Sequence, residues 1–124
     1  RSSFNPPKDI DQYVFIADET AQPAVLSCIE NLNGKKYIGI FETKNKQYEY
    51  DLKGISDCIK WIYRDDFVEQ NEDLVNEIVS LVQKADNTYI FGAGEGKRML
   101  TLRRVLKEVG FSTKETNLIG YWKK

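Results

Sequence analysis

The sequence predicts an α/β domain, an open, five-stranded, mostly parallel sheet with helices on both faces. Short apolar runs rich in β-branched and aromatic residues alternate with amphipathic helical patterns in the order β-α-β-β-α-β-α-β. The strand segments are short and strongly apolar, which is typical of strands buried on both faces of a sheet. At 124 residues, 41% of them apolar, the chain has the size of one domain with one core.

The first strand is expected at 12–17, an apolar run that follows an irregular lead-in or linker stub at 1–11. The helix behind it begins at residue 20 or 21 and ends at Leu32, because apolar side chains recur there at helical spacing. Pro23 suits the first turn of this helix, and Asn33-Gly34 ends it. The apolar stripe consists of Ala21, Ala24, Val25, Cys28, Ile29 and Leu32.

The remaining elements continue the alternation to the end of the chain. Two strands are expected within 35–42 and 55–63, with a candidate small element at 47–52 between them. After these, we expect a helix at 71–85, a strand at 88–91, a helix at 95–109 that Gly110 stops, and a strand at 117–122. The stripe of the last helix is Met99, Leu102, Val105, Leu106 and Val109. The domain is therefore predicted to span 12–124.

The composition excludes several classes of function. Histidine is absent, which removes Ser-His and Cys-His nucleophilic pairs and every His-containing metal site, and no other catalytic or metal-ligating constellation is evident. Cys28 and Cys58 are too few for a thiolate metal site or a disulfide framework, which favours a reducing, cytoplasmic location. The net charge of −1 argues against a nucleic-acid binder. No apolar run approaches the roughly 20 residues of a membrane-spanning helix.

Parallel sheets of this kind bind ligands at the carboxyl ends of their strands, which directs attention to the two β-to-α turns. Gly92, Gly94 and Glu95 follow one strand and open a helix, so backbone amides there can face an anion. Asp18-Glu19-Thr20 forms the other turn. Two such turns facing one crevice suit a dinucleotide. The alternatives are a plain tight turn at the glycines and N-caps at Asp18 and Thr20.

Arginine and aromatic residues add further candidates at the same edge. Arg64 follows the third strand and is a candidate phosphate clamp, or it pairs with its neighbours Asp65-Asp66 on the surface. Arg98 lies near the start of the last helix, where an anion would suit it, but a methylene stem lining the core is the favoured interpretation. Tyr121 and Trp122 end the last strand, where flat rings would cover a flat cofactor or pack into the core.

The segments FGAGEGKRMLTLRRVLKEVGF and GYWKK resemble the siderophore-interacting proteins, which are NAD(P)H-dependent, FAD-containing ferric-siderophore reductases. Their final domain carries an Ala-Gly-Glu turn, an arginine-bearing helix and a Gly-Tyr-Trp-basic ending. The family's Asp-Glu-Thr-Ala-x-Pro-Ala turn and its Trp-x-x-Arg segment match in order as well, over about residues 10–124. The matching residues are Ala17 to Ala21 with Pro23-Ala24, Glu42, Trp61 with Arg64, Ala93-Gly94-Glu95, Arg103-Arg104, and Gly120 to Lys123.

The resemblance implies a ferredoxin-reductase-like NAD(P)-binding domain. It implies a nicotinamide role for Asp18, Glu19, Thr20, Gly94 and Glu95, while similarity to the wider superfamily makes Arg64 the candidate for the adenosine ribose or its 2′-phosphate. The alanine-rich stretch usual after Ala-Gly-Glu is replaced here by Gly96-Lys97-Arg98.

The family's N-terminal FAD-binding barrel is missing, so the chain is expected to be a carboxy-terminal part. Its partners would be that FAD domain and a ferric siderophore, which Lys123 would attract. Hydride would pass from NAD(P)H to FAD and single electrons to Fe(III), and the isolated domain would be inactive. A nucleotide- or partner-binding α/β module without redox activity is the alternative from another class.

Overall fold

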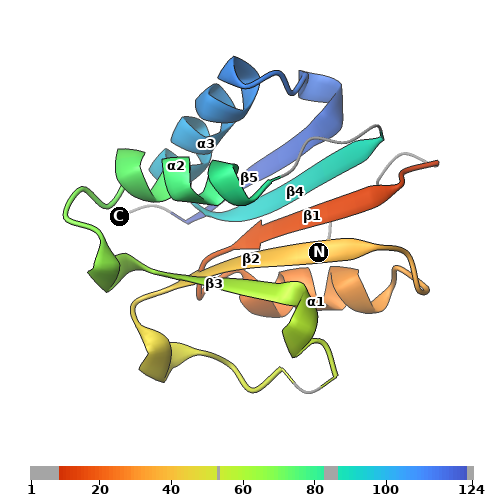
Figure 1. The fold of residues 1–124 in the computed structure, drawn as a ribbon, viewed down its shortest axis with the longest axis horizontal. Coiled ribbons are helices and arrows are strands. Elements are labelled where there is room, and N and C mark those ends of the chain that lie inside the picture. Colours follow the sequence, from red (N-terminus) through yellow and green to blue (C-terminus); the bar gives the residue numbers. More distant parts are fainter. Residues whose placement is uncertain (1–8, 53, 83–86, 123–124) are drawn as a thin grey trace.

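The computed structural model describes residues 9–52, 54–82 and 87–122, which form one sheet with helices on both sides (Figure 1). Within these residues the sheet has the order β3-β2-β1-β4-β5, and every neighbouring pair of strands is parallel. The predicted fold class is thus confirmed. The strands are β1 (Gln12–Ala17), β2 (Tyr37–Thr43), β3 (Ile59–Tyr63), β4 (Thr88–Glu95) and β5 (Thr116–Trp122); the helices are α1 (Gln22–Glu30), α2 (Glu72–Leu81) and α3 (Gly96–Glu108).

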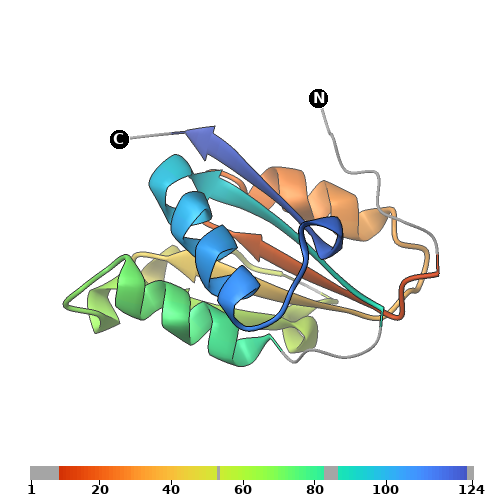
Figure 2. The ribbon, with the colours of Figure 1, turned by 90° about the horizontal axis from the view of Figure 1, so that it is seen from above.

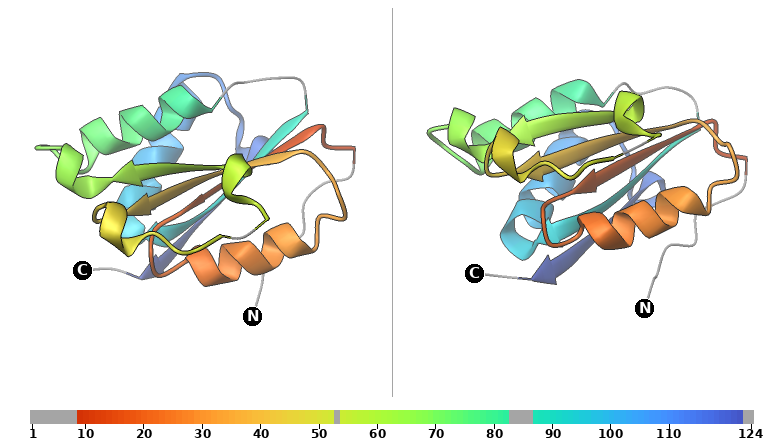
Figure 3. Two further views of the ribbon diagram at one scale, coloured as in Figure 1. Left: turned by 60° about the horizontal axis from the view of Figure 1, so that its bottom comes forward. Right: turned by 90° about the horizontal axis from the view of Figure 1, so that it is seen from below.

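The sheet lies between α1 on one face and α2 and α3 on the other (Figures 2 and 3), and each face carries an apolar core. Side chains alternate along β1, so that Phe15 packs toward α1 and Ile16 toward α2 and α3. Both lie almost entirely out of contact with solvent. Because helices of this chain bury both faces, we expect the described residues to fold without help from another domain.

The buried face of helix α1 differs from the predicted apolar stripe at two positions, 22 and 24. Ala24 is exposed, whereas Gln22 is fully buried and donates its Nε2 to the backbone oxygen of Glu42 at 2.9 Å. The helix also begins one or two residues later than expected, at Gln22, because Asp18 organises the preceding residues into a turn. A buried glutamine with a partner distant in sequence leaves no trace in hydrophobic periodicity.

The ends of the other helices lie close to their predicted positions. Helix α3 begins one residue after the predicted start and ends at Glu108, with Gly110 at a φ of 109° behind it. Val109, expected in the stripe, is exposed. Helix α2 ends at Leu81, short of the predicted residue 85; residues 83–86 lie outside the described part. The small element expected at 47–52 is a single 3-10 turn at Lys46–Tyr48.

Strand β4 is longer than predicted, and this corrects the interpretation of its glycines. The strand runs to Glu95 instead of ending at Phe91, because Gly92 pairs with Ile16 of β1 and Gly94 with Gly120 of β5. A β-carbon on Gly92 would lie 2.8 Å from Cδ2 of Leu118. The first glycine therefore serves close packing within the sheet rather than a turn.

Strands β1 and β4 mark the point where chain connections leave the sheet in opposite directions. The chain leaves β1 for α1 on one face and leaves β4 for α3 on the other (Figure 2). A crevice forms between such strands at their carboxyl ends, which is where open α/β sheets bind ligands.

Candidate functional site

A cavity of about 1270 Å³ lies at the carboxyl edge of the sheet. Its wall contains predicted site residues from every one of the expected segments. These are Asp18, Glu19, Thr20, Arg64, Glu95 and Trp122. Gly92, Gly94 and Tyr121 are not part of the wall, and Lys123 lies outside the described residues.

Asp18 ties together three separate elements at the centre of this wall. Its Oδ1 accepts hydrogen bonds from the Thr20 amide and hydroxyl and from the Ala21 amide, at 2.7–3.2 Å. Its Oδ2 accepts from the Glu95 amide at 3.0 Å and from the indole Nε1 of Trp122 at 2.9 Å. Asp18 as a whole residue is only 5% exposed. A single buried carboxylate therefore orders the ends of β1, β4 and β5.

Glu95 has the corresponding role at the start of α3. It is the N-cap, and its carboxylate accepts hydrogen bonds from the amides of Lys97 and Arg98 at 3.0 Å each. The amides expected to face a ligand anion are thus already bonded to side chains of this protein, at Asp18 as well as at Glu95. An anion in the cavity must rely on side-chain cations instead.

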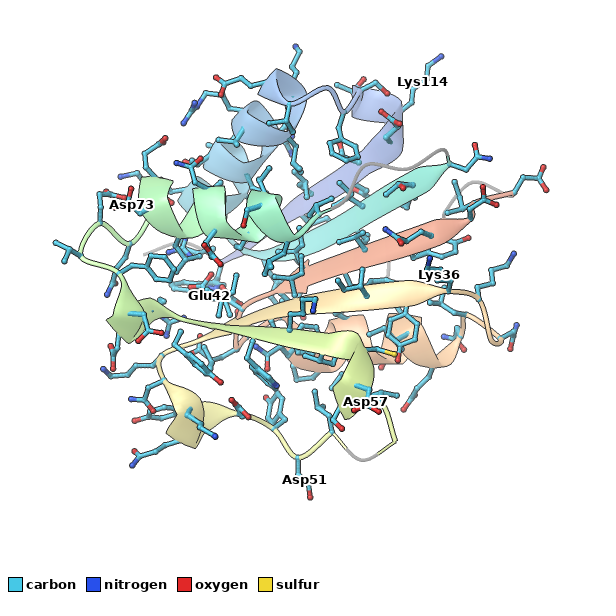
Figure 4. All side chains as sticks on the ribbon, in the orientation of Figure 1. Lys36, Glu42, Asp51, Asp57, Asp73 and Lys114 are labelled. Carbon is cyan, nitrogen blue, oxygen red and sulfur yellow. The ribbon has the colours of Figure 1, made fainter. Side chains whose placement is uncertain are left out.

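The arginines of the cavity are held in a network of ion pairs. Arg64 reaches Glu19 with both terminal nitrogens, at 2.5 and 2.7 Å, and Glu42 at 3.0 Å. Arg98 pairs with the second oxygen of Glu42. Figure 4 shows Glu42 at the carboxyl edge, between the end of β3 and α2. The two guanidinium groups are therefore neutralised by two carboxylates.

This network corrects two expectations. Arg64 does not pair with Asp65, which instead binds Lys44 at 3.1 Å. Arg98 does not simply line the core: besides its ion pair with Glu42, its Nε donates to Asn71 at 3.1 Å. It also donates to the backbone oxygen of Gln70, so the segment before α2 is fastened to the start of α3.

The charges of the network shift the acid–base behaviour of its members. Burial opposes ionisation of Glu19, but hydrogen bonds from Arg64 and the backbone outweigh it and hold the pKa of Glu19 below its usual value. The hydrogen bonds that Arg64 donates to Glu19 raise the pKa of Arg64. Both side chains are charged at neutral pH.

The other wall of the cavity comes from α3 and β5. Arg103 donates its Nη2 to the backbone oxygen of Leu118 at 2.8 Å, and Lys97 projects from the first turn of α3. A β-carbon on Gly120 would come within 3.2 Å of the Cα of Gly96, so β5 passes close against the start of the helix. Trp122 is 38% exposed, and Tyr121 is 53% exposed on the outer side.

Sequence reasoning missed Glu42 and underrated Arg98 as site residues. A signal existed for each. A carboxylate at the end of an apolar strand needs a partner when buried, and a cation in the first turn of a helix is poorly placed unless an anion is near. Each signal indicates that the residue needs a partner of opposite charge but does not identify that partner. Glu42 and Arg98, which pair with each other, lie 56 residues apart in the sequence.

The described residues contain no group of three or more side chains able to hold a metal ion. Within the same ranges, no helix is long and apolar enough to cross a membrane.

The fold and the position of the cavity define the class of protein, a ferredoxin-reductase-like α/β domain. Residues 10–124 match the model of the family described as siderophore-interacting protein. The chain belongs to this family.

Solved structures agree with this assignment. A siderophore utilization protein from T. fusca is 27% identical with a TM-score of 0.76, and the match covers 98% of this chain and 47% of that one. The siderophore-interacting protein from A. baumannii is 21% identical with a TM-score of 0.77, covering 100% and 51%. An intact type IV self-sufficient cytochrome P450 monooxygenase shares the fold at 14% identity and a TM-score of 0.73, over 95% of this chain and 15% of its own.

The chain spans about half the length of the siderophore-interacting structures that it matches. A comparison with curated proteins gives no match.

Proposed function

We propose that this chain is the nicotinamide-dinucleotide-binding domain of a flavin-dependent ferric-siderophore reductase. The observation that carries the proposal is the position of the large cavity, at the carboxyl edge where β1 and β4 send their helices to opposite faces. Membership of the siderophore-interacting family supports the redox role. Cys28 and Cys58 are not joined in a disulfide, which fits a reducing cytoplasm, where we place the reaction.

The cavity wall fits an extended dinucleotide because its chemistry changes along its length. At the end of the cavity next to β2 and β3, carboxylates and Arg64 can hydrogen-bond to the hydroxyls of an adenosine ribose. Lys97 and Arg103 suit a pyrophosphate, because the nearby helix amides are bonded to Glu95. Trp122, half-exposed at the end of β5, suits the nicotinamide end.

The residues of this chain contribute binding and orientation. NAD(P)H, when bound, would supply a hydride to the FAD that a partner domain would hold, for single-electron reduction of Fe(III) in a siderophore. Asp18 orients Trp122 and both β-to-α turns through hydrogen bonds that need no change of protonation. A site that only binds and orients requires no general base, in keeping with a chain that has no histidine.

The FAD domain is the proposed partner, and the exposed ring of Tyr121 beside Trp122 favours docking at the end of β5. Lys123 is the next residue in the sequence, and we propose that its side chain attracts an anionic ferric siderophore. If so, Lys123→Glu in the two-domain protein should slow iron reduction most at low ionic strength, with flavin reduction unchanged. Equal rates of iron reduction at low salt would remove Lys123 from the site.

Isothermal titration of residues 1–124 with NADH and NADPH tests the binding role. At least one should bind with one-to-one stoichiometry. Arg103→Gln should weaken binding about tenfold, since it removes one charge-assisted contact. The matched control is Arg104→Gln, because Arg104 pairs with Glu72 and Glu108 on the outer side of α3. If neither dinucleotide binds, the result would contradict the proposed function and favour the alternative of a binding module without redox activity.

Activity tests the partial nature of the enzyme. Residues 1–124 alone should reduce no ferric chelate in the presence of NADPH or NADH. Stoichiometric FAD binding with iron reduction by this chain alone would contradict the assignment of FAD to another domain.

A further inference from the structure

The proposed function leaves open which dinucleotide the site takes, and the Glu19–Arg64 pair addresses this choice. NADH and NADPH differ by one phosphate on the 2′ oxygen of the adenosine ribose. In open α/β sheets an acidic side chain binds the free 2′-hydroxyl, and a nearby arginine accommodates the 2′-phosphate. Here Glu42 is the second-last residue of β2 and Arg64 follows β3, so both kinds of group lie at the same end of the cavity.

Arg64 is already engaged in the way that a phosphate would engage it. Glu19 binds both terminal nitrogens at once, its Oε1 at 2.7 Å from Nη1 and its Oε2 at 2.5 Å from Nη2. Nη1 also lies 3.0 Å from Oε2 of Glu42. This two-point contact is the geometry by which arginine recognises carboxylates and phosphates. A phosphate can take the guanidinium only by displacing Glu19.

Displacement of Glu19 would be costly because other groups hold it in place. Its Oε2 accepts hydrogen bonds from the Lys44 amide at 3.1 Å and from the Thr43 hydroxyl at 3.3 Å. The side chains of Arg64 and Glu19 are 24% and 34% exposed, so water screens the pair only in part, and Glu42 beside them is 6% exposed. A carboxylate left beside an incoming phosphate would repel it.

Among the described residues that line this end of the cavity, each arginine is paired with a carboxylate. Arg64 and Arg98 face Glu19 and Glu42, two positive charges against two negative ones. Lys44, just outside the cavity wall, pairs with Asp65 at 3.1 Å. A ribose with a free 2′-hydroxyl needs no unpaired cation, since it can donate a hydrogen bond to either carboxylate.

We propose that Glu19 is a specificity-determining residue that sets this site for the dinucleotide without a 2′-phosphate, NADH, by occupying the guanidinium of Arg64. The inference rests on the proposed function. It assigns Glu19 no part in the chemical step, only in the choice between two ligands.

The test is isothermal titration of residues 1–124 at one fixed ionic strength with two pairs of probes. NADH is compared with NADPH, and 5′-AMP with adenosine 2′,5′-bisphosphate. The unaltered chain should bind NADH at least as tightly as NADPH. Glu19→Gln should shift the preference toward NADPH by tenfold or more, mainly through tighter binding of the phosphorylated probes. Adding Arg64→Gln to that variant should cancel the gain.

Glu69→Gln is the matched control, because Glu69 lines the same cavity and loses the same charge, while its carboxylate accepts hydrogen bonds from the amides of Asn71 and Glu72. It should leave the ratio of the two affinities unchanged. If Glu19→Gln fails to fold, Glu19→Asp replaces it: the shorter side chain cannot span both nitrogens as Glu19 does, and a smaller shift in the same direction is expected.

Four results would overturn the inference. They are a tenfold or greater preference of the unaltered chain for NADPH, an unchanged ratio in both Glu19 variants, an equal shift in Glu69→Gln, and a gain that survives the loss of Arg64. With NADH binding intact, each contradicts the role of Glu19 alone. Absence of binding by every probe would instead overturn the proposed function, and this inference with it.

Discussion

The indole Nε1 of Trp122 donates a hydrogen bond to Oδ2 of Asp18 at 2.9 Å, across 104 residues of sequence. The same oxygen accepts from the Glu95 amide, so one atom joins the ends of three strands. Because the carboxylate is buried, each of its donors depends on it for a partner. Stability and the shape of the cavity therefore depend on the same side chain.

Asp18→Asn should lower the free energy of unfolding by about 1–3 kcal/mol, because an NH₂ group would then face donors that now meet an oxygen. Urea unfolding of residues 1–124 measures the change. Asp51→Asn, at an exposed position on the far side of β3, is the control and should stay within about 0.5 kcal/mol (Figure 4). Equal stability of Asp18→Asn and the unaltered chain would mean that the five donors find other partners.

Gly92→Ala and Gly94→Ala should separate packing from binding. A β-carbon on Gly92 meets Leu118, whereas one on Gly94 lies 3.0 Å from Oδ2 and 3.2 Å from Cγ of Asp18. Both variants should lose about 1–3 kcal/mol of stability through overpacking. Only Gly94→Ala should also weaken dinucleotide binding, because it displaces the carboxylate that orients Trp122. Similar dissociation constants for the two variants would contradict this distinction.

The acid sensitivity of the fold should depend on Glu19. Its pKa in the folded state lies below the ordinary value of 4.5, so its contribution to stability is present above that value and is lost as the pH falls through the folded pKa. Urea midpoints between pH 7 and pH 3 should therefore fall less steeply for Glu19→Gln than for the unaltered chain. Parallel curves would show that the pair with Arg64 adds no stability in solution.

Gly110→Ala should cost about 1 kcal/mol, for a purely conformational reason. Gly110 has a φ of 109°, and a β-carbon there would meet nothing within 4 Å. Dinucleotide binding should not change, because Gly110 lies at the opposite end of α3 from the cavity. A loss of affinity equal to that of Gly94→Ala would indicate that the effect spreads through α3.

The fold was predictable because its elements are local patterns. The buried strands, the helical stripes and the stop at Gly110 each depend on neighbouring residues, and the parallel sheet with helices on both faces follows from the alternation of strands and helices. The predicted end of β4 was wrong for a physical reason. Gly92 and Gly94 look like a turn in sequence, but β1 and β5 on either side pair with them and extend the strand.

The position of the candidate site was predictable from the sequence, but its residues and their ion pairs were predictable only in part. Asp18, Glu95 and Trp122 lie where the ends of strands were expected to bring them. The bonding of Asp18 to backbone amides was foreseen as the alternative of an N-cap, whereas the N-cap role of Glu95 was not foreseen. The pairing of Arg64 with Glu19 could not be foreseen, since those residues lie 45 apart and nearer acids, Asp65 and Asp66, were available in the sequence.

The bond from Trp122 to Asp18 also bears on how the molecule is made. β1 is the central strand and emerges first, but its neighbour β4 follows only after β2, β3 and α2, and β5 comes last. A chain still lacking β5 has Asp18 in place and no wall opposite it. The cavity is therefore complete only when β5 has joined the sheet, and a bound dinucleotide would favour the complete sheet over forms in which β5 is detached.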